Sequence, residues 1–159
     1  MKYVGKNIPR NDGFDKATGL GQFTMDVSMP HMLYARVLRS PYAHAKVVKI
    51  DTSAAEALPG VVTVCTFENT TNKPFNTSAT MVTTPRPAEP VRDQTIFTDE
   101  PKYIGDEVAA VAAETEAIAA EAIKRIKVEY EVLPAVYDPV EALKPDSPEV
   151  QPLYGNKEH

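Results

Sequence analysis

Residues 103–138 read YIGDEVAAVAAETEAIAAEAIKRIKVEYEVLPAVYD and contain three predicted elements in succession. The first, Val108–Ala113, is an unbroken apolar run that is typical of a strand buried on both faces. A buried helix start has the same pattern, and Ala is a poor strand former. A helix follows, since Thr115 can cap its N-terminus and cations occupy its last turn. Lys127–Val132 then alternates apolar and polar side chains, which predicts a half-buried strand.

The predicted helix carries one apolar stripe. Its members recur at three- and four-residue spacing, and they are Ile118, Ala119, Ala122, Ile123 and Ile126. A helix between two strands buries such a stripe against the sheet that the strands form. We therefore expect a core that includes Val111, Ile118, Ile126, Val128 and Tyr130.

Two earlier segments also alternate and are expected to be strands, Leu33–Leu38 and Ala45–Ile50. The short connection between them, Arg39–His44, predicts that the two strands pair with each other in antiparallel fashion. This connection is longer than a tight hairpin and contains Pro41.

A second strand–helix–strand unit is expected over Ala45–Phe67. Ser53–Glu56 matches a capping box, in which the first and last side chains each accept a hydrogen bond from the other residue's amide. Pro59-Gly60 should stop this helix early, and Val61–Phe67 follows as a strand rich in β-branched residues.

The remaining segments give the expected boundaries. Residues 1–21 are expected to form an extended N-terminal arm with turns at residues 11–13 and 18–19. The expected domain covers residues 22–143, with a last helix starting at Asp138, and residues 144–159 form a C-terminal tail.

Residues 69–102 form an insertion rich in Pro, Thr and Asn, which is long for a connection inside a compact domain. It is either a solvated, mobile insertion or a loop that docks on another domain, and the sequence leaves both open. Short strands are expected near Thr80–Thr83 and Thr95–Phe97.

Length and composition predict one soluble domain. The chain has 159 residues, of which 43% are hydrophobic and 25% charged, and its formal net charge is −5. The negative charge disfavours nucleic acid or an anionic membrane as partner. The sequence shows no apolar run long enough to span a bilayer and no signal peptide, and its one cysteine, Cys65, is consistent with a cytoplasmic location.

Residues that could carry chemistry are few, and we predict no catalytic, cofactor-binding or metal-binding residue. The three histidines and one cysteine lack metal-ligand spacing, and no glycine-rich phosphate loop is present. The carboxylate pairs Asp106-Glu107 and Glu129/Glu131 fall at a turn and on a solvated strand face. The most unusual polar cluster is Arg39-Ser40-Pro41-Tyr42-Ala43-His44, which could bind an anion or a partner; alternatively, such residues cap strand ends and shield a sheet edge.

Several of these stretches resemble one family. The strongest is LYARVLRSPYAHA at Leu33–Ala45, followed by Gly105–Glu114 and Val128–Val136. Together with Pro59-Gly60-Val61 they resemble the N-terminal α/β hammerhead domain of the molybdenum-binding subunit of xanthine dehydrogenases and aldehyde oxidases. The resemblance runs from about Val4 to Leu143. It departs from the family pattern at Met25, Tyr42 and Asp106, and it is poor in the 69–102 insertion.

The resemblance implies an α+β fold of one domain, with a mixed sheet, two main helices and a β-hammerhead. It also implies a parent enzyme that hydroxylates N-heterocycles or aldehydes with oxygen from water. The molybdopterin cofactor would lie in C-terminal molybdopterin-binding domains of the same subunit, beyond residues 144–159. Iron–sulfur clusters and FAD would lie in partner domains or subunits.

The resemblance assigns no cofactor residue to this chain, so the chain is expected to be an inert structural domain, excised from its parent or encoded as a separate piece. It makes Arg39, Ser40, Tyr42 and His44 candidates for an interdomain contact, exposed when the domain is alone. The alternative is a free-standing binding or interaction module that reuses the fold.

Overall fold

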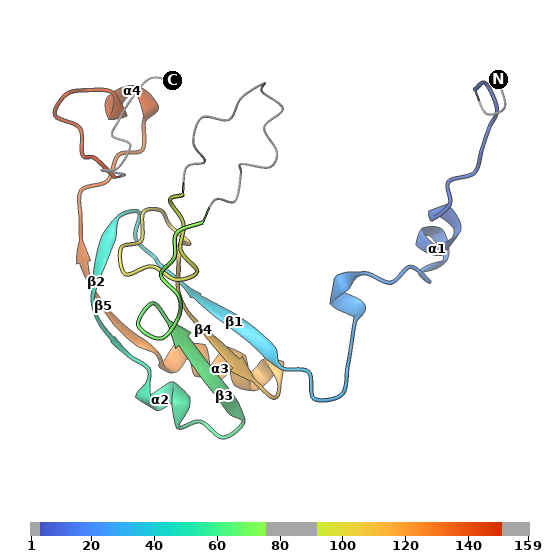
Figure 1. Ribbon diagram of the computed structural model, residues 1–159, viewed down its shortest axis with the longest axis horizontal. Coiled ribbons are helices and arrows are strands. Elements are labelled where there is room, and N and C mark those ends of the chain that lie inside the picture. Colours follow the sequence, from blue (N-terminus) through green and yellow to red (C-terminus); the bar gives the residue numbers. More distant parts are fainter. Residues whose placement is uncertain (1–3, 76–91, 151–159) are drawn as a thin grey trace. The chain divides into compact units, whose positions relative to one another are not determined.

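The computed structural model describes residues 4–75 and 92–150 of the chain (Figure 1). It divides into two units, an N-terminal segment that ends at Met32 and a domain that begins at Leu33.

The domain contains two antiparallel sheets. The three-stranded sheet has the order β1-β4-β3, with β1 at Tyr34–Arg39, β4 at Glu107–Ala113 and β3 at Val61–Thr66. The two-stranded sheet pairs β2, Ala45–Asp51, with β5, Lys127–Val132. The α+β class is confirmed, but all these pairings are antiparallel, whereas the resemblance implied one mixed sheet.

The expected pairing of the first two strands is wrong. Tyr34 of β1 lies opposite Ala113 of β4, and Ala45 of β2 lies opposite Val132 of β5. The connection after Arg39 therefore carries the chain from one sheet to the other. The physical reason is the apolar character of β4: a strand whose faces and edges are buried needs a neighbour on each side, and β1 and β3 supply them.

The helices begin and end where their capping residues place them. The long helix α3 spans Glu116–Arg125, and the Thr115 hydroxyl accepts a hydrogen bond of 3.2 Å from the Ile118 amide. The short helix α4 spans Pro139–Ala142, and the Asp138 carboxylate accepts from the amides of Val140 and Glu141. Both predicted caps are confirmed.

The capping box predicted for α2 is wrong. This one-turn helix spans Ser53–Glu56, but its N-cap is Thr52. The Ser53 hydroxyl and amide both donate to the Asp51 carboxylate, at 2.6 and 3.1 Å, so the serine is held by the strand before it. The Glu56 carboxylate accepts instead from the Thr52 hydroxyl at 2.7 Å.

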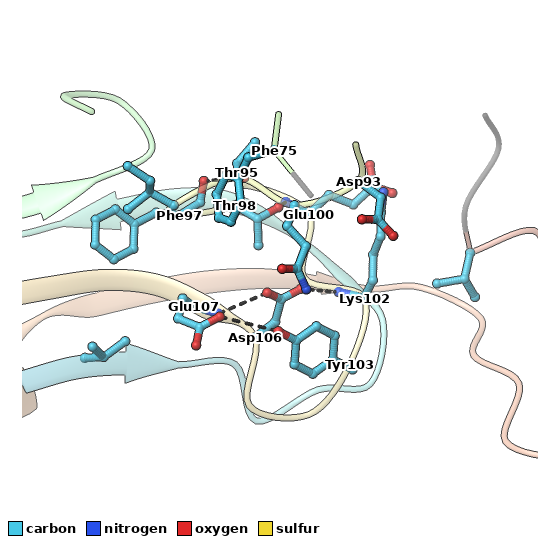
Figure 2. Close-up of a pocket in the computed structure, with 14 residues that line it drawn as sticks. Phe75, Asp93, Thr95, Phe97, Thr98, Glu100, Lys102, Tyr103, Asp106 and Glu107 are labelled. Carbon is cyan, nitrogen blue, oxygen red and sulfur yellow. Dashed lines mark hydrogen bonds between the residues drawn. The ribbon is translucent and has the colours of Figure 1, made fainter. Parts of the chain in front are cut away.

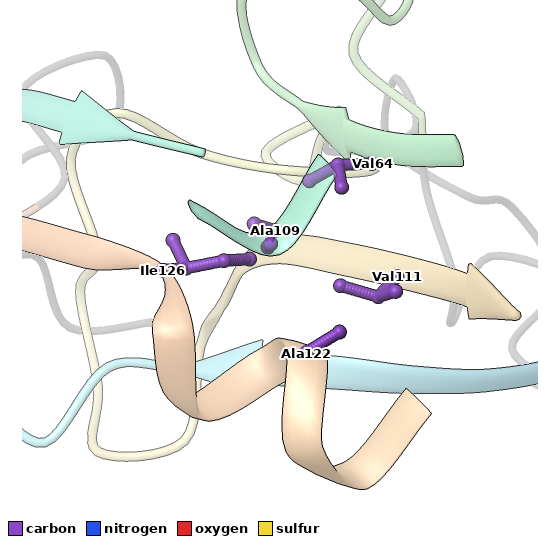
Figure 3. Close-up of a cluster of buried hydrophobic side chains, with 6 residues drawn as sticks. Val64, Ala109, Val111, Ala122 and Ile126 are labelled. Atoms are coloured by element: carbon purple, nitrogen blue, oxygen red, sulfur yellow. The ribbon is translucent and has the colours of Figure 1, made fainter. Parts of the chain in front are cut away.

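The core lies between α2, α3 and the three-stranded sheet. Its buried cluster consists of Ala55, Val64, Ala109, Val111, Ala122 and Ile126 (Figure 3). Of the five expected core residues, Val111 and Ile126 are buried, while Ile118, Val128 and Tyr130 are only half-buried. The difference arises because the buried side chains of α3 are alanines, Ala119 and Ala122, and because β5 belongs to the smaller sheet.

The insertion is described only at its two ends. Phe75 and Gln94 form an isolated antiparallel bridge, and the segment expected as a strand at Thr95–Phe97 is not one. Phe97 is nevertheless buried and anchors the returning chain. The strand expected at Thr80–Thr83 lies outside the described residues.

The N-terminal segment contains a helix, α1 at Gly13–Thr18, and a 3-10 turn, η1 at Thr24–Asp26. The turns predicted in this segment lie at the two ends of α1. The helix between them was not expected, because the segment was predicted to be an extended arm. Gly19 closes the helix in the left-handed conformation, with φ of 75°.

Candidate interdomain surface

The connection from β1 to β2 is held to a turn at Gly105-Asp106. The Ser40 amide donates to the Asp106 carbonyl and the Ser40 carbonyl accepts from the Gly105 amide, both at 2.8 Å. The Ser40 hydroxyl forms a small turn with the backbone of Tyr42, at 3.0 and 3.1 Å. Only 2% of Ser40 is exposed, so this residue fixes the path of the connection from inside.

His44 fixes the other end of the connection. Its Nδ1 lies 2.7 Å from the Pro134 carbonyl oxygen, and since a carbonyl oxygen can only accept, Nδ1 carries the hydrogen. Its Nε2 faces the Glu100 carboxylate at 3.5 Å. The ring is buried, and it joins the start of β2 to the chain after β5 and to the end of the insertion.

Arg39 and Tyr42 are the exposed members of the cluster. Arg39 Nη1 donates to the Gly105 carbonyl and to the Glu107 carboxylate, both at 2.6 Å. The Tyr42 ring packs edge-on against Tyr130, with ring centroids 5.2 Å apart, and 39% of Tyr42 remains exposed. Burial raises the pKa of the Tyr130 hydroxyl, with Tyr42 as a smaller cause.

The expectation that the whole connection is exposed is therefore wrong for two of the four candidates. Ser40 and His44 are buried and form hydrogen bonds within the domain. This agrees with the alternative that such residues cap strand ends. Arg39 and Tyr42 are exposed.

A small hollow of about 270 Å³ adjoins Tyr42. Its lining consists of Pro41, Tyr42, Ala43, His44, Ile104, Val132, Leu133, Ala135 and Tyr137. Three of its large side chains are unusually open to solvent: Ile104 is 65% exposed, Val132 61% and Tyr137 81%. Sequence reasoning missed these residues, because Ile104 lies far in sequence from Val132 and Tyr137 and only the fold brings them together.

A larger acidic groove of about 740 Å³ is lined in part by residues of the 101–107 turn (Figure 2). Apolar side chains line it, including Val37, Phe75, Ile96 and Phe97. Its charged side chains are four carboxylates, Asp93, Glu100, Asp106 and Glu107, and one ammonium group, that of Lys102.

The adjacent carboxylates in this groove have structural partners. Asp106 accepts hydrogen bonds from the amides of Lys102 and Glu107, at 2.9 and 3.0 Å, and thereby shapes the turn to which Ser40 is bonded. Burial raises the pKa of the Asp106 carboxyl, although these amides act in the opposite direction. Glu107 forms an ion pair with Arg39 at 2.6 Å.

A metal centre needs several ligand side chains in one place. Within residues 4–75 and 92–150, no three His, Cys, Asp or Glu side chains come together as a metal ion would require.

No helix in this part of the chain is long and apolar enough to cross a membrane.

Fold and surface together define an α+β domain of hammerhead type, in which buried side chains hold the strand connection and a small hollow lies beside it. Residues 18–134 match the family described as the a/b hammerhead domain of aldehyde oxidase and xanthine dehydrogenase. The chain belongs to this family.

Similar proteins are much longer than this chain. It is 37% identical to a probable hypoxanthine oxidase of Escherichia coli O157:H7 over 150 residues, which are 94% of this chain and 15% of that protein. It is 40% identical over 138 residues to a probable xanthine dehydrogenase subunit of Bacillus subtilis, covering 87% of this chain and 17% of the relative.

Solved structures of longer proteins also contain a similar domain. The aldehyde oxidoreductase of Desulfovibrio desulfuricans superposes with a TM-score of 0.80 at 34% identity, over 93% of this chain and 17% of that one. A Cu,Mo-CO dehydrogenase superposes with a TM-score of 0.77, over 91% and 17%.

Proposed function

We propose that this chain acts as the N-terminal structural domain of a molybdenum hydroxylase resembling xanthine dehydrogenase or aldehyde oxidase. The observation that carries the proposal is its 37–40% identity to such proteins, of which it corresponds to only 15–17%. The parent enzyme would add water-derived oxygen to an N-heterocycle or an aldehyde. The molybdopterin cofactor would sit in the rest of the same subunit, with iron–sulfur clusters and FAD in partner domains or subunits. A cytoplasmic location suits the single Cys65.

The docking surface in this proposal centres on Tyr42. Exposed apolar side chains concentrate around it at Ile104, Val132 and Tyr137, and Arg39 is bonded to Gly105, the residue next to Ile104. Interface cores are enriched in aromatic side chains and Arg, which matches this set. The buried Ser40 and His44 would hold the surface in shape from within.

The first experiment tests whether the chain alone is inert. The purified chain, supplied with molybdate during expression, is assayed for bound molybdenum and for hydroxylation of xanthine and of an aldehyde. Neither is expected. Stoichiometric molybdenum or turnover in the isolated chain would contradict the proposal.

The second experiment supplies the missing part. A chimera replaces the matched residues of the Bacillus subtilis relative with this chain, and we expect it to bind molybdenum. Tyr42→Ser with Ile104→Ser should lower the thermal stability of the chimera more than that of the isolated chain. Val48→Ser, at an exposed position of β2 away from the hollow, is the matched control.

A free-standing interaction module remains the second candidate, since the acidic groove could take a basic peptide. The coding sequence downstream of codon 159 separates the two. Continuation into a glycine-rich molybdopterin-binding region supports the domain role, and a stop codon supports the module.

A further inference from the structure

Both ring nitrogens of His44 face an oxygen that accepts hydrogen bonds. Nδ1 lies 2.7 Å from the Pro134 carbonyl oxygen, and Nε2 lies 3.5 Å from the Glu100 carboxylate. A neutral imidazole has one N–H, and the Pro134 carbonyl takes it. In the neutral ring the Nε2 lone pair therefore faces a carboxylate oxygen, and these two acceptors repel each other.

The two partners differ in their access to water. Only 7% of His44 is exposed, so its ring has little solvent to turn to. The Glu100 side chain is 41% exposed, so its carboxylate can move away from the ring into water. The contact between them is therefore one that can be made or broken by the movement of one side chain.

The contact lies on the segment that joins the two sheets, residues 98–101, which we call the seam. Two amides of β2 donate to carbonyls of the seam at 3.1 and 2.7 Å, one on each side of Glu100. The Thr98 amide at the other end of the seam donates to the carbonyl of Glu107, the first residue of β4, at 2.9 Å. A side-chain contact at Glu100 thus acts where β2 is held to β4.

Few other charges act on the ring. The hydroxyls of Tyr42 and Tyr137 line the same hollow as His44, and tyrosine carries no charge at neutral pH. Along the two strands, Lys46 and Glu131 come next; both are exposed and lie opposite each other in register, so their charges offset. Glu100 is therefore the charged group whose contact with the ring a proton would change.

We propose that His44 and Glu100 form a proton-operated clasp on the seam between the two sheets. Histidine is the side chain that ordinarily takes up a proton from solvent between pH 8 and pH 5. The new N–H on Nε2 then donates to the Glu100 carboxylate, and the repulsive contact becomes a charge-assisted hydrogen bond. The clasp is closed in acid and opens as pH rises. It makes the firmness of the seam depend on pH.

Nitrogen NMR of the full chain tests the clasp directly, because a ring nitrogen that carries hydrogen differs in chemical shift from one that does not. At pH 8 the hydrogen should be on Nδ1 of His44, and at pH 5 on both nitrogens. Amide hydrogen exchange then reports on the seam. Protection factors of Ala45 and Val47, whose amides donate to the seam, should be at least about threefold higher at pH 5 than at pH 8.

Two variants separate the clasp from a general effect of pH. In Glu100→Gln the side-chain amide can donate to the Nε2 lone pair without a proton, so the difference in protection between the two pH values should vanish. Glu121→Gln removes the same charge from an exposed position of α3, and the difference should remain.

A His44 ring with one hydrogen at pH 5, or with its hydrogen on Nε2 at pH 8, overturns the clasp. It is also overturned if Glu100→Gln keeps the full difference in protection. His44→Asn offers a donor to Pro134 that does not titrate, and a pH effect that survives in this variant equally rules the clasp out.

Discussion

At the scale of single residues, the domain depends on small side chains where helix and sheet meet. Ala109, Ala113, Ala119 and Ala122 are fully buried, which lets α3 approach the sheet closely. Gly60 serves the same purpose at the turn into β3. Its φ is 86°, and a Cβ there would lie 2.7 Å from Ile118 Cδ1. Space at this contact is filled, so changes of volume in either direction should be felt.

Ile126 is the largest side chain of the buried cluster around α3, and Ile126→Ala should lower the free energy of unfolding by about 2–5 kcal/mol. The reason is the lost transfer free energy together with the cavity left behind. Urea denaturation at equilibrium measures the change. Ile104→Ala is the control, because Ile104 is 65% exposed and its truncation should cost no more than about 0.5 kcal/mol. Equal losses for the two variants would mean that Ile126 is not a core residue.

Asp106 should make the stability of the domain depend on pH, and the burial of its carboxyl fixes the sign of that dependence. Its pKa in the folded domain lies above the ordinary value of 3.8, so the folded state holds a proton that the unfolded state has released. Stability contributed by this group is present at low pH and falls as pH rises from about 3.8 through the raised pKa. Measured against Asp106→Asn, the wild-type chain should therefore lose relative stability on going from pH 4 to pH 7. A relative gain over the same range would contradict this assignment.

At the scale of elements, α3 is the one long helix in the described part of the domain, and its start is defined by a side chain. Thr115 provides the cap, and Glu116 in the first turn pairs with Arg36 of β1. That ion pair is exposed at both ends and contributes little, so the cap is the stronger of the two local restraints.

Thr115→Ala should therefore cost about 0.5–2 kcal/mol of unfolding free energy, because the Ile118 amide loses its acceptor. Thr115→Ser keeps the hydroxyl and should recover most of the loss. Chemical denaturation of both variants provides the measurement, and a serine variant as unstable as the alanine variant would assign the effect to the methyl group instead.

At the scale of the whole molecule, local patterns predicted the elements better than their partners. The alternation in Lys127–Val132 and the caps at Thr115 and Asp138 correspond to observed elements, because they depend on neighbours in sequence. The pairing of β1 with β4 joins residues far apart, and no local signal specifies it. The same holds for the candidate surface. Arg39 and Tyr42 could be picked out from the sequence, whereas Ile104, Val132 and Tyr137 come together only in the folded domain.

The central place of β4 also affects the order in which the domain can form during synthesis. Its two neighbours, β1 and β3, leave the ribosome first, and neither can complete its sheet before Glu107–Ala113 has been made. Until then both strands wait with open edges, as in other folds dominated by distant contacts. A nascent chain stopped at residue 106 should be degraded by added protease, and one stopped at residue 150 should survive. Translation speed between β3 and β4, across the long insertion, thus sets how long the unfinished sheet is exposed to aggregation and to chaperones.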